Sequence, residues 1–91
     1  MSRRLNRSWT VLASYQTSEA DRCVDVFSRP EGTFGFEEFR RDPEDMGVWT
    51  PAAFYSRQEF RSIAAAKTAA GLAVPWLAAI PEFRRDVGKA V

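Results

Sequence analysis

Apolar and polar residues alternate through the first half of the chain, and this period predicts β-strands. The first strand covers residues 9–15, where one set of alternate positions holds Trp9, Val11, Ala13 and Tyr15 and the other holds Thr10, Leu12 and Ser14. A polar connection at residues 16–22 leads to a second strand at residues 23–27, and a third strand runs from residue 33 to about residue 40. The pattern therefore predicts an antiparallel sheet built in chain order.

The turn between the second and third strands has a recognisable chemistry. Pro30 fixes φ for the first central position of a type I turn, and Gly32 can take the left-handed conformation that follows. These features predict a three-residue hairpin loop with a glycine bulge. The loop sets a register in which Arg29 lies opposite Thr33. Further along the hairpin this register gives the pairs Phe27 with Gly35, Val26 with Phe36, and Cys23 with Phe39.

The register divides the hairpin into two faces. One face is apolar and should meet a helix; it carries Val24, Val26, Phe34 and Phe36. The opposite face is mixed, with Phe27 and Phe39 beside Cys23, Asp25 and Glu37. A phenylalanine that lies over a cross-strand glycine, here Phe27 over Gly35, is a stabilising arrangement in sheets.

The second half of the chain predicts a short edge strand and then a helix. The strand begins at Trp49 and extends to about Tyr55, interrupted by Pro51. Two helix starts remain open: a capping box that begins at Ser56, or a cap by Ser62. In either case Pro75 ends or kinks the helix. The apolar stripe of this helix consists of Ile63, Ala66, Ala70, Ala73, Val74 and Leu77. We expect one more helical turn at residues 82–87.

These elements define an α+β fold: a small two-layer domain with an antiparallel sheet of three to four strands and one C-terminal helix packed on one face. We expect residues 1–8 to form a flexible N-terminal tail, residues 9–80 to form the domain, and residues 81–91 to form a C-terminal tail. The length of 91 residues fits one domain.

Charge and composition narrow the function classes. Thirteen basic and twelve acidic residues give a net charge of +1, whereas nucleic-acid-binding domains are usually clearly basic. The apolar segment at residues 63–80 is mostly alanine and contains Gly71 and Pro75, so we do not expect it to span a membrane. A single cysteine and no predicted secretory signal favour the reducing cytoplasm.

The sequence contains no histidine, which removes the commonest general base and metal ligand. We therefore expect no cofactor, no metal site and no catalytic residues, and a protein that is not an enzyme. Acidic residues cluster after the third strand, and we interpret them as a solvated edge and loop: Glu37, Glu38, Asp42, Glu44 and Asp45.

One candidate interaction surface is the second face of the sheet, because a single helix covers only one face. Four aromatic residues would lie there: Phe27, Phe39, Trp49 and Tyr55. Exposed apolar patches mark partner surfaces, so a homodimer that joins sheet to sheet or edge to edge would bury them. Alternatively the C-terminal tail folds over this face, with Phe83 and Val87 as its lid. The sequence leaves both open.

Two further hypotheses rest on other residues. Cys23 is a candidate reactive thiol if nearby positive charge lowers its pKa. Two arginine pairs are candidate anion or nucleic-acid contacts: Arg40 with Arg41, and Arg84 with Arg85. Nearby aromatic residues could stack on the bases of a single strand. Because the net charge is small, we do not expect nucleic acid to be the partner and favour a second protein chain instead.

The stretch from Asp21 to Asp45 (DRCVDVFSRPEGTFGFEEFRRDPED), the following WTP and the VPWL after the alanine-rich helix resemble small bacterial proteins of unknown function. The resemblance covers most of residues 9–77 and implies a bacterial cytosolic origin, but no activity. The leading hypothesis is a non-enzymatic interaction module that self-associates through its sheet. The alternatives are a weak single-stranded nucleic-acid binder and a small-ligand or thiol-dependent protein.

Overall fold

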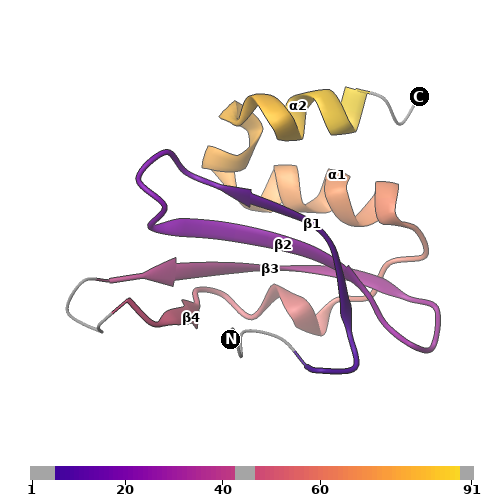
Figure 1. Ribbon diagram of the computed structural model, residues 1–91. Helices are drawn as coiled ribbons and strands as arrows, with labels where there is room; N and C mark the ends of the chain where they lie inside the picture. The colour runs from indigo at the N-terminus through magenta and orange to yellow at the C-terminus, as the bar shows by residue number, and fades with distance from the viewer. Residues whose placement is uncertain (1–5, 43–46, 89–91) are drawn as a thin grey trace.

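The computed structural model describes residues 6–42 and 47–88, and within them four antiparallel strands form one sheet (Figure 1). The strands lie in chain order as β1 (Thr10–Gln16), β2 (Arg22–Ser28), β3 (Phe34–Arg41) and β4 (Trp49–Pro51). Then come the short 3-10 helix η2 (Tyr55–Arg57), the helix α1 (Ile63–Ala73), the 3-10 helix η3 (Pro75–Ala79) and the helix α2 (Pro81–Gly88). The predicted α+β class is confirmed.

The β2–β3 hairpin has the register that its turn predicts. Phe27 pairs with Gly35, and Cys23 pairs with Phe39. Arg29 N–H donates to the Thr33 carbonyl at 2.8 Å, and Gly32 has φ = 96°, in the left-handed region. A Cβ atom on Gly35 would lie 2.9 Å from the Phe27 ring, so only glycine fits beneath this ring.

The core lies between the sheet and α1. Val24 and Val26 of β2 and Phe36 of β3 are buried on the face that α1 covers. Small residues of α1, Ala66 and Ala70, face them, so the helix lies close to the strands. Tyr15, Val74, Leu77 and Phe83 complete the buried cluster. Of the predicted apolar stripe, Ile63, Ala66, Ala70 and Ala73 are the residues of α1 that pack on the core, whereas Val74 and Leu77 lie after the helix.

The C-terminal segment is more ordered than the predicted tail. Residues Pro81–Gly88 form the helix α2, which packs beside α1 on the same side of the sheet (Figure 1). Phe83 is buried in the core, where its ring meets Tyr15 edge-on at 5.3 Å. The packed structure therefore extends past residue 80, because Phe83 fills the space above Tyr15.

Ser62 caps α1: its Oγ accepts a hydrogen bond from Ala65 N–H at 3.0 Å. The alternative start at Ser56 is wrong, since Ser56 lies within η2. α1 ends at Ala73, before Pro75, as expected for a residue that cannot continue a helix.

The predicted fourth strand is also too long. β4 ends at Pro51, where the regular pairing with β3 stops. The chain nevertheless follows the edge of β3: Ala52 N–H donates to the Glu38 carbonyl, and Phe60 pairs with Phe34 further along. Residues 49–60 therefore cover the edge of β3 at both ends.

The two candidate caps can be separated by substitution. We expect Ser62→Ala to lower the free energy of unfolding by about 1 kcal/mol, because a cap hydrogen bond is lost. Ser56→Ala is the matched control and should change it by less than about 0.5 kcal/mol, since only backbone groups of Ser56 are bonded. Urea unfolding measures both, and equal losses would contradict the assignment of Ser62 as the cap.

Candidate functional site

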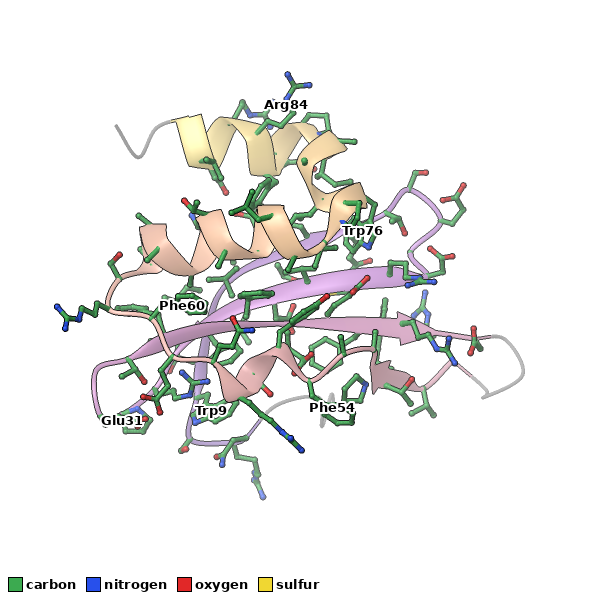
Figure 2. The ribbon with its side chains drawn as sticks, turned by 180° about the vertical axis from the view of Figure 1, so that it is seen from behind. Trp9, Glu31, Phe54, Phe60, Trp76 and Arg84 are labelled. Carbon is green, nitrogen blue, oxygen red and sulfur yellow. The ribbon has the colours of Figure 1, made fainter. Side chains whose placement is uncertain are left out.

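The second face of the sheet is not an exposed aromatic surface. Phe27 and Phe39 are both 0% exposed. Trp9 stacks on Phe27 with ring centres 4.7 Å apart and an angle of 7° between the rings. Figure 2 shows Trp9 on the side of the sheet away from α1. The expectation that Phe27 and Phe39 lie uncovered is therefore wrong: both are buried, and the Trp9 ring lies on Phe27.

A buried arginine organises this face. Arg29 is 7% exposed, and its guanidinium lies 4.7 Å from the Trp9 ring centre and 5.0 Å from that of Phe27. It donates to the carbonyls of Ser56 and Gln58, which belong to a distant loop. It also donates to Phe34 O at 3.1 Å and to Thr33 Oγ1 at 3.3 Å within its own hairpin. Arg29 thus ties the hairpin to residues 56–58.

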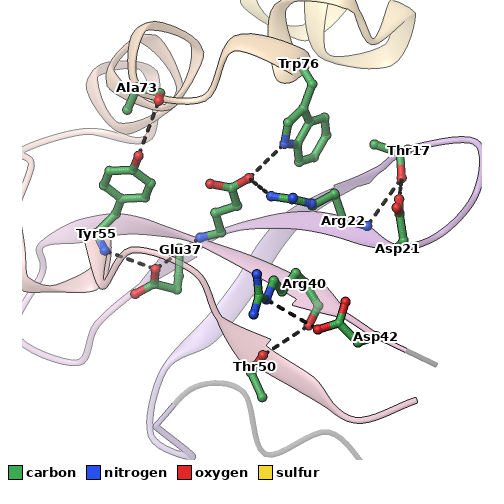
Figure 3. A network of polar contacts seen from close by, with 11 residues as sticks. Thr17, Asp21, Arg22, Glu37, Arg40, Asp42, Thr50, Tyr55, Ala73 and Trp76 are labelled. Carbon is green, nitrogen blue, oxygen red and sulfur yellow. Dashed lines mark hydrogen bonds and ion pairs between the residues drawn. The ribbon is translucent and has the colours of Figure 1, made fainter. Parts of the chain in front are cut away.

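Glu37 binds the start of the same loop, whereas Arg29 binds its carbonyl groups (Figure 3). Its carboxylate accepts N–H bonds from Tyr55 at 3.0 Å and Ser56 at 2.9 Å. These N–H groups open η2, where a negative charge is favourable. Phe54 precedes them with φ = 58°, an unusual conformation for a bulky residue. The two bonds to Glu37 compensate that strain, so Glu37 has a structural role.

Glu38 points to the opposite face, toward η3. Its carboxylate accepts a hydrogen bond from Trp76 Nε1 at 2.8 Å and lies 3.5 Å from Arg22 (Figure 3). Glu37 and Glu38 are both buried, so interpreting them as solvated edge residues was wrong. Asp42 pairs with Arg40 at 3.6 Å, and residues 44 and 45 lie outside the described part of the chain.

Tyr55 and Trp49 lie apart from Phe27. Tyr55 packs against Phe36 in the core beneath α1, and its hydroxyl donates to the Ala73 carbonyl at 3.3 Å. Trp49 is half-buried under the Arg41 guanidinium, 4.8 Å from the ring centre. The four predicted aromatic residues therefore form no common surface.

Cys23 is fully buried and belongs to a small polar cluster on the second face. Its thiol donates to Asp25 Oδ1 at 3.2 Å, and Ser14 Oγ donates to the same oxygen at 2.7 Å. With 0% exposure, Cys23 is out of reach of reagents and partners in the folded chain. The structure does not support the hypothesis of a reactive thiol, because such a thiol must be accessible.

The arginine pairs are not brought into one patch. Arg41 donates to the Ala20 carbonyl at 2.8 Å, and Arg40 pairs with Asp42, so both serve the end of the sheet. Arg84 and Arg85 are exposed on α2, and Figure 2 shows Arg84 pointing away from the sheet. Phosphate contacts need several convergent cations, and these two pairs belong to different parts of the fold.

The C-terminal segment does not cover the second face. Phe83 and Val87 pack on the core beneath α1 and α2, so the predicted lid is wrong. α2 is fixed there by Asp86, which accepts a hydrogen bond from the Tyr15 hydroxyl at 2.6 Å and lies 4.0 Å from Lys67 Nζ. Burial and the Asp86 carboxylate raise the pKa of Tyr15 above its ordinary value.

The surface that sequence reasoning missed is the outer edge of β1. Within the part of the chain that the structure describes, this strand has a neighbour on one side only, and most of its residues are exposed. Val11 is 46% exposed and Leu12 is 44% exposed. No charged residue and no proline occurs between residues 8 and 18. That absence was the available signal, because natural edge strands usually carry a charge or a proline.

A second exposed apolar region lies on α1. Leu72 is 84% exposed and lines a shallow groove of ≈ 570 Å³ with Phe60, Ala64, Ala65, Thr68, Ala69 and Val87. The only charged residue of α1, Lys67, faces Asp86 of α2. The groove is thus apolar but is built mainly from small side chains.

Comparison with known proteins adds no assignment: no family model matches the chain, and neither the curated proteins nor the solved structures contain a match. Within residues 6–42 and 47–88, no group of three acidic or cysteine side chains could hold a metal ion. In that same part of the chain, no helix has the length and apolar character needed to cross a membrane.

The role of Arg29 can be tested with a conservative change. We expect Arg29→Lys to lower the free energy of unfolding by about 2–3 kcal/mol, because one ammonium cannot reach carbonyls on both sides of the guanidinium. Arg40→Lys is the control and should cost less than about 0.5 kcal/mol, since Arg40 makes an exposed ion pair. Urea unfolding followed by tryptophan fluorescence measures both, and a neutral Arg29→Lys would contradict this role.

The Tyr15–Asp86 bond predicts an alkaline dependence of stability. Because the pKa of Tyr15 is higher in the folded chain than in the unfolded chain, its contribution is complete below about pH 10 and is lost as the pH rises further. Tyr15→Phe should therefore cost about 1–2 kcal/mol at pH 7. The difference from wild type should shrink above about pH 10, as measured by urea unfolding at each pH. A constant difference across this range would refute the linkage.

Proposed function

We propose that this chain is a non-enzymatic interaction module that self-associates through its sheet, and that the contacting element is the outer edge of β1. The observation that carries the proposal is a seven-residue edge strand, Thr10–Gln16, with exposed Val11 and Leu12 and with no charge or proline. An edge strand presents backbone N–H and C=O groups that can pair with another strand.

The direction of these backbone groups follows from the ladder between β1 and β2. Thr17 N–H donates to the Arg22 carbonyl at 3.1 Å, so Thr17 and, by alternation, Tyr15 and Ala13 turn their backbone groups toward β2. Ser14 and Gln16 must then turn theirs outward. Among the described residues, no backbone hydrogen bond reaches either one from that side.

Other surfaces suit association less well. The second face is covered over Phe27 and Phe39, and residues 49–60 follow the edge of β3. On α1, Leu72 lines the shallow groove with Phe60, Val87, three alanines and a threonine, but the backbone groups of a helix are bonded within the helix and offer no row for strand pairing. The edge of β1 combines exposed apolar side chains with unpaired backbone groups.

A cytoplasmic location belongs to the same proposal. The single cysteine is buried and donates a hydrogen bond to a carboxylate, which suits a protein that needs no disulfide. A bacterial source, which the resemblance noted in the sequence would imply, is part of the same proposal.

Two matched leucine substitutions locate the interface. We expect the wild-type chain to gain mass with concentration in sedimentation velocity. Leu12→Lys should abolish this association, because it places a charge on the edge. Leu72→Lys, an equal change on the α1 groove, should leave it intact. Circular dichroism checks that both variants fold, which the exposure of both side chains favours. Loss of association in Leu72→Lys alone would move the interface to α1.

A further inference from the structure

The two ends of the β1 edge carry residues of opposite charge. Arg7 precedes the strand, while Glu19 and Asp21 follow it, and all three are exposed. Between these ends the strand is uncharged. Arg41, which donates to the Ala20 carbonyl, also lies near the second end, and Arg22 there pairs with Glu38. One copy of the edge is therefore basic at its start and weakly acidic at its end.

From this we infer that two copies join their β1 edges antiparallel around a two-fold axis beside Tyr15, to form one continuous sheet. The inference rests on the proposed function and names its geometry. A two-fold axis perpendicular to an edge strand pairs the strand with itself in the antiparallel direction. That direction brings the acidic end of one copy toward the basic end of the other, whereas a parallel arrangement would bring like charges together.

A bulge in β1 limits the part of the edge that pairs. The register with β2 shifts between Val11 and Ala13, and Figure 1 shows β1 bending along its length. Bulges of this kind turn an edge away from a straight partner. The straight part after the bulge starts at Ala13, and within it Ser14 and Gln16 hold the outward backbone groups.

These two residues complement each other across the axis. Ser14 of each copy donates to and accepts from Gln16 of the other, because both members of a hydrogen-bonded antiparallel pair must turn their backbone groups toward the partner. The turn after Gln16, which carries Glu19, then lies beyond the paired residues, toward the Val11 end of the second copy, where Arg7 precedes the strand. The Ser14 side chain remains bonded to Asp25 in its own copy.

The size of the contact predicts its strength. A few strand pairs with the Val11 and Leu12 side chains cover less than the roughly 800 Å² per partner of a standard stable interface. We therefore expect a dimer with a dissociation constant of roughly micromolar size, visible over a concentration series and weakened by salt.

The first test removes one outward donor. Gln16→Pro deletes the N–H group that pairs with the second copy, and an edge strand tolerates proline where its N–H faces away from the sheet. We expect a folded monomer in sedimentation velocity, with circular dichroism and urea unfolding as the check on folding. Gln16→Ala is the matched control: it removes the same side chain but keeps the N–H, so it should dimerise like wild type. Equal dimerisation of Gln16→Pro and wild type overturns the register.

The second test reverses the charges at the ends of the edge. We expect Arg7→Glu and Glu19→Arg each to weaken the dimer about tenfold at low salt, since each change acts twice in a two-fold dimer. The double variant should recover most of the loss. Single reversals that strengthen the dimer would indicate a parallel arrangement and overturn the inference.

The two proposals fail separately. If Leu12→Lys abolishes the dimer while Gln16→Pro and the charge reversals leave it unchanged, the edge of β1 is the interface but the two-fold register is wrong. If the wild-type chain stays monomeric at every concentration, self-association itself is refuted.

Discussion

The guanidinium of Arg29 is the contact on which the second face of the sheet depends. It lies where the β2–β3 turn begins, and it reaches the carbonyls of Ser56 and Gln58 across a large gap in the sequence. Burying a charged group is costly unless its donors are bonded, and here backbone carbonyls and the rings of Trp9 and Phe27 supply the partners. The positive charge is thus solvated by dipoles and aromatic faces, which fixes the loop that connects the sheet to α1.

This arrangement explains why Gly35 lies in β3. The Arg29 side chain and the Phe27 ring both cross the strand at this point, and a Cβ on Gly35 would lie 2.9 Å from each. Glu37, two residues on, holds the N–H groups of Tyr55 and Ser56. One stretch of β3 therefore positions both the hairpin and the loop after β4, so a change at Gly35 would disturb contacts that are distant in sequence.

The sequence predicted what local chemistry determines. Pro30 and Gly32 define a turn, and the turn defines the pairs from Arg29 to Cys23, so the register and the face that meets α1 were predictable. The contents of the second face were not. Trp9 and Ser56 come to Arg29 through long-range packing, which no spacing of apolar residues reveals. The choice between Ser56 and Ser62 as the helix cap depended on another long-range contact. Glu37 accepts a hydrogen bond from Ser56 N–H, and Ser56 therefore lies in η2 and not at the start of α1.

The same packing makes the two edges of the sheet unequal. The chain after β3 is drawn along the β3 edge, where Ala52 and Phe60 pair with it and Arg29 and Glu37 fix the turn between them. Among residues 6–42 and 47–88, no segment follows the outer edge of β1 in this way, and Trp9, just before the strand, stacks on Phe27 of the second face instead. The chain thus uses its own segments to cover much of one edge and one face, whereas the described residues give β1 a bulge near Leu12 and no charge. This difference between the two edges is the reason for our proposal that β1 acquires its second neighbour on association.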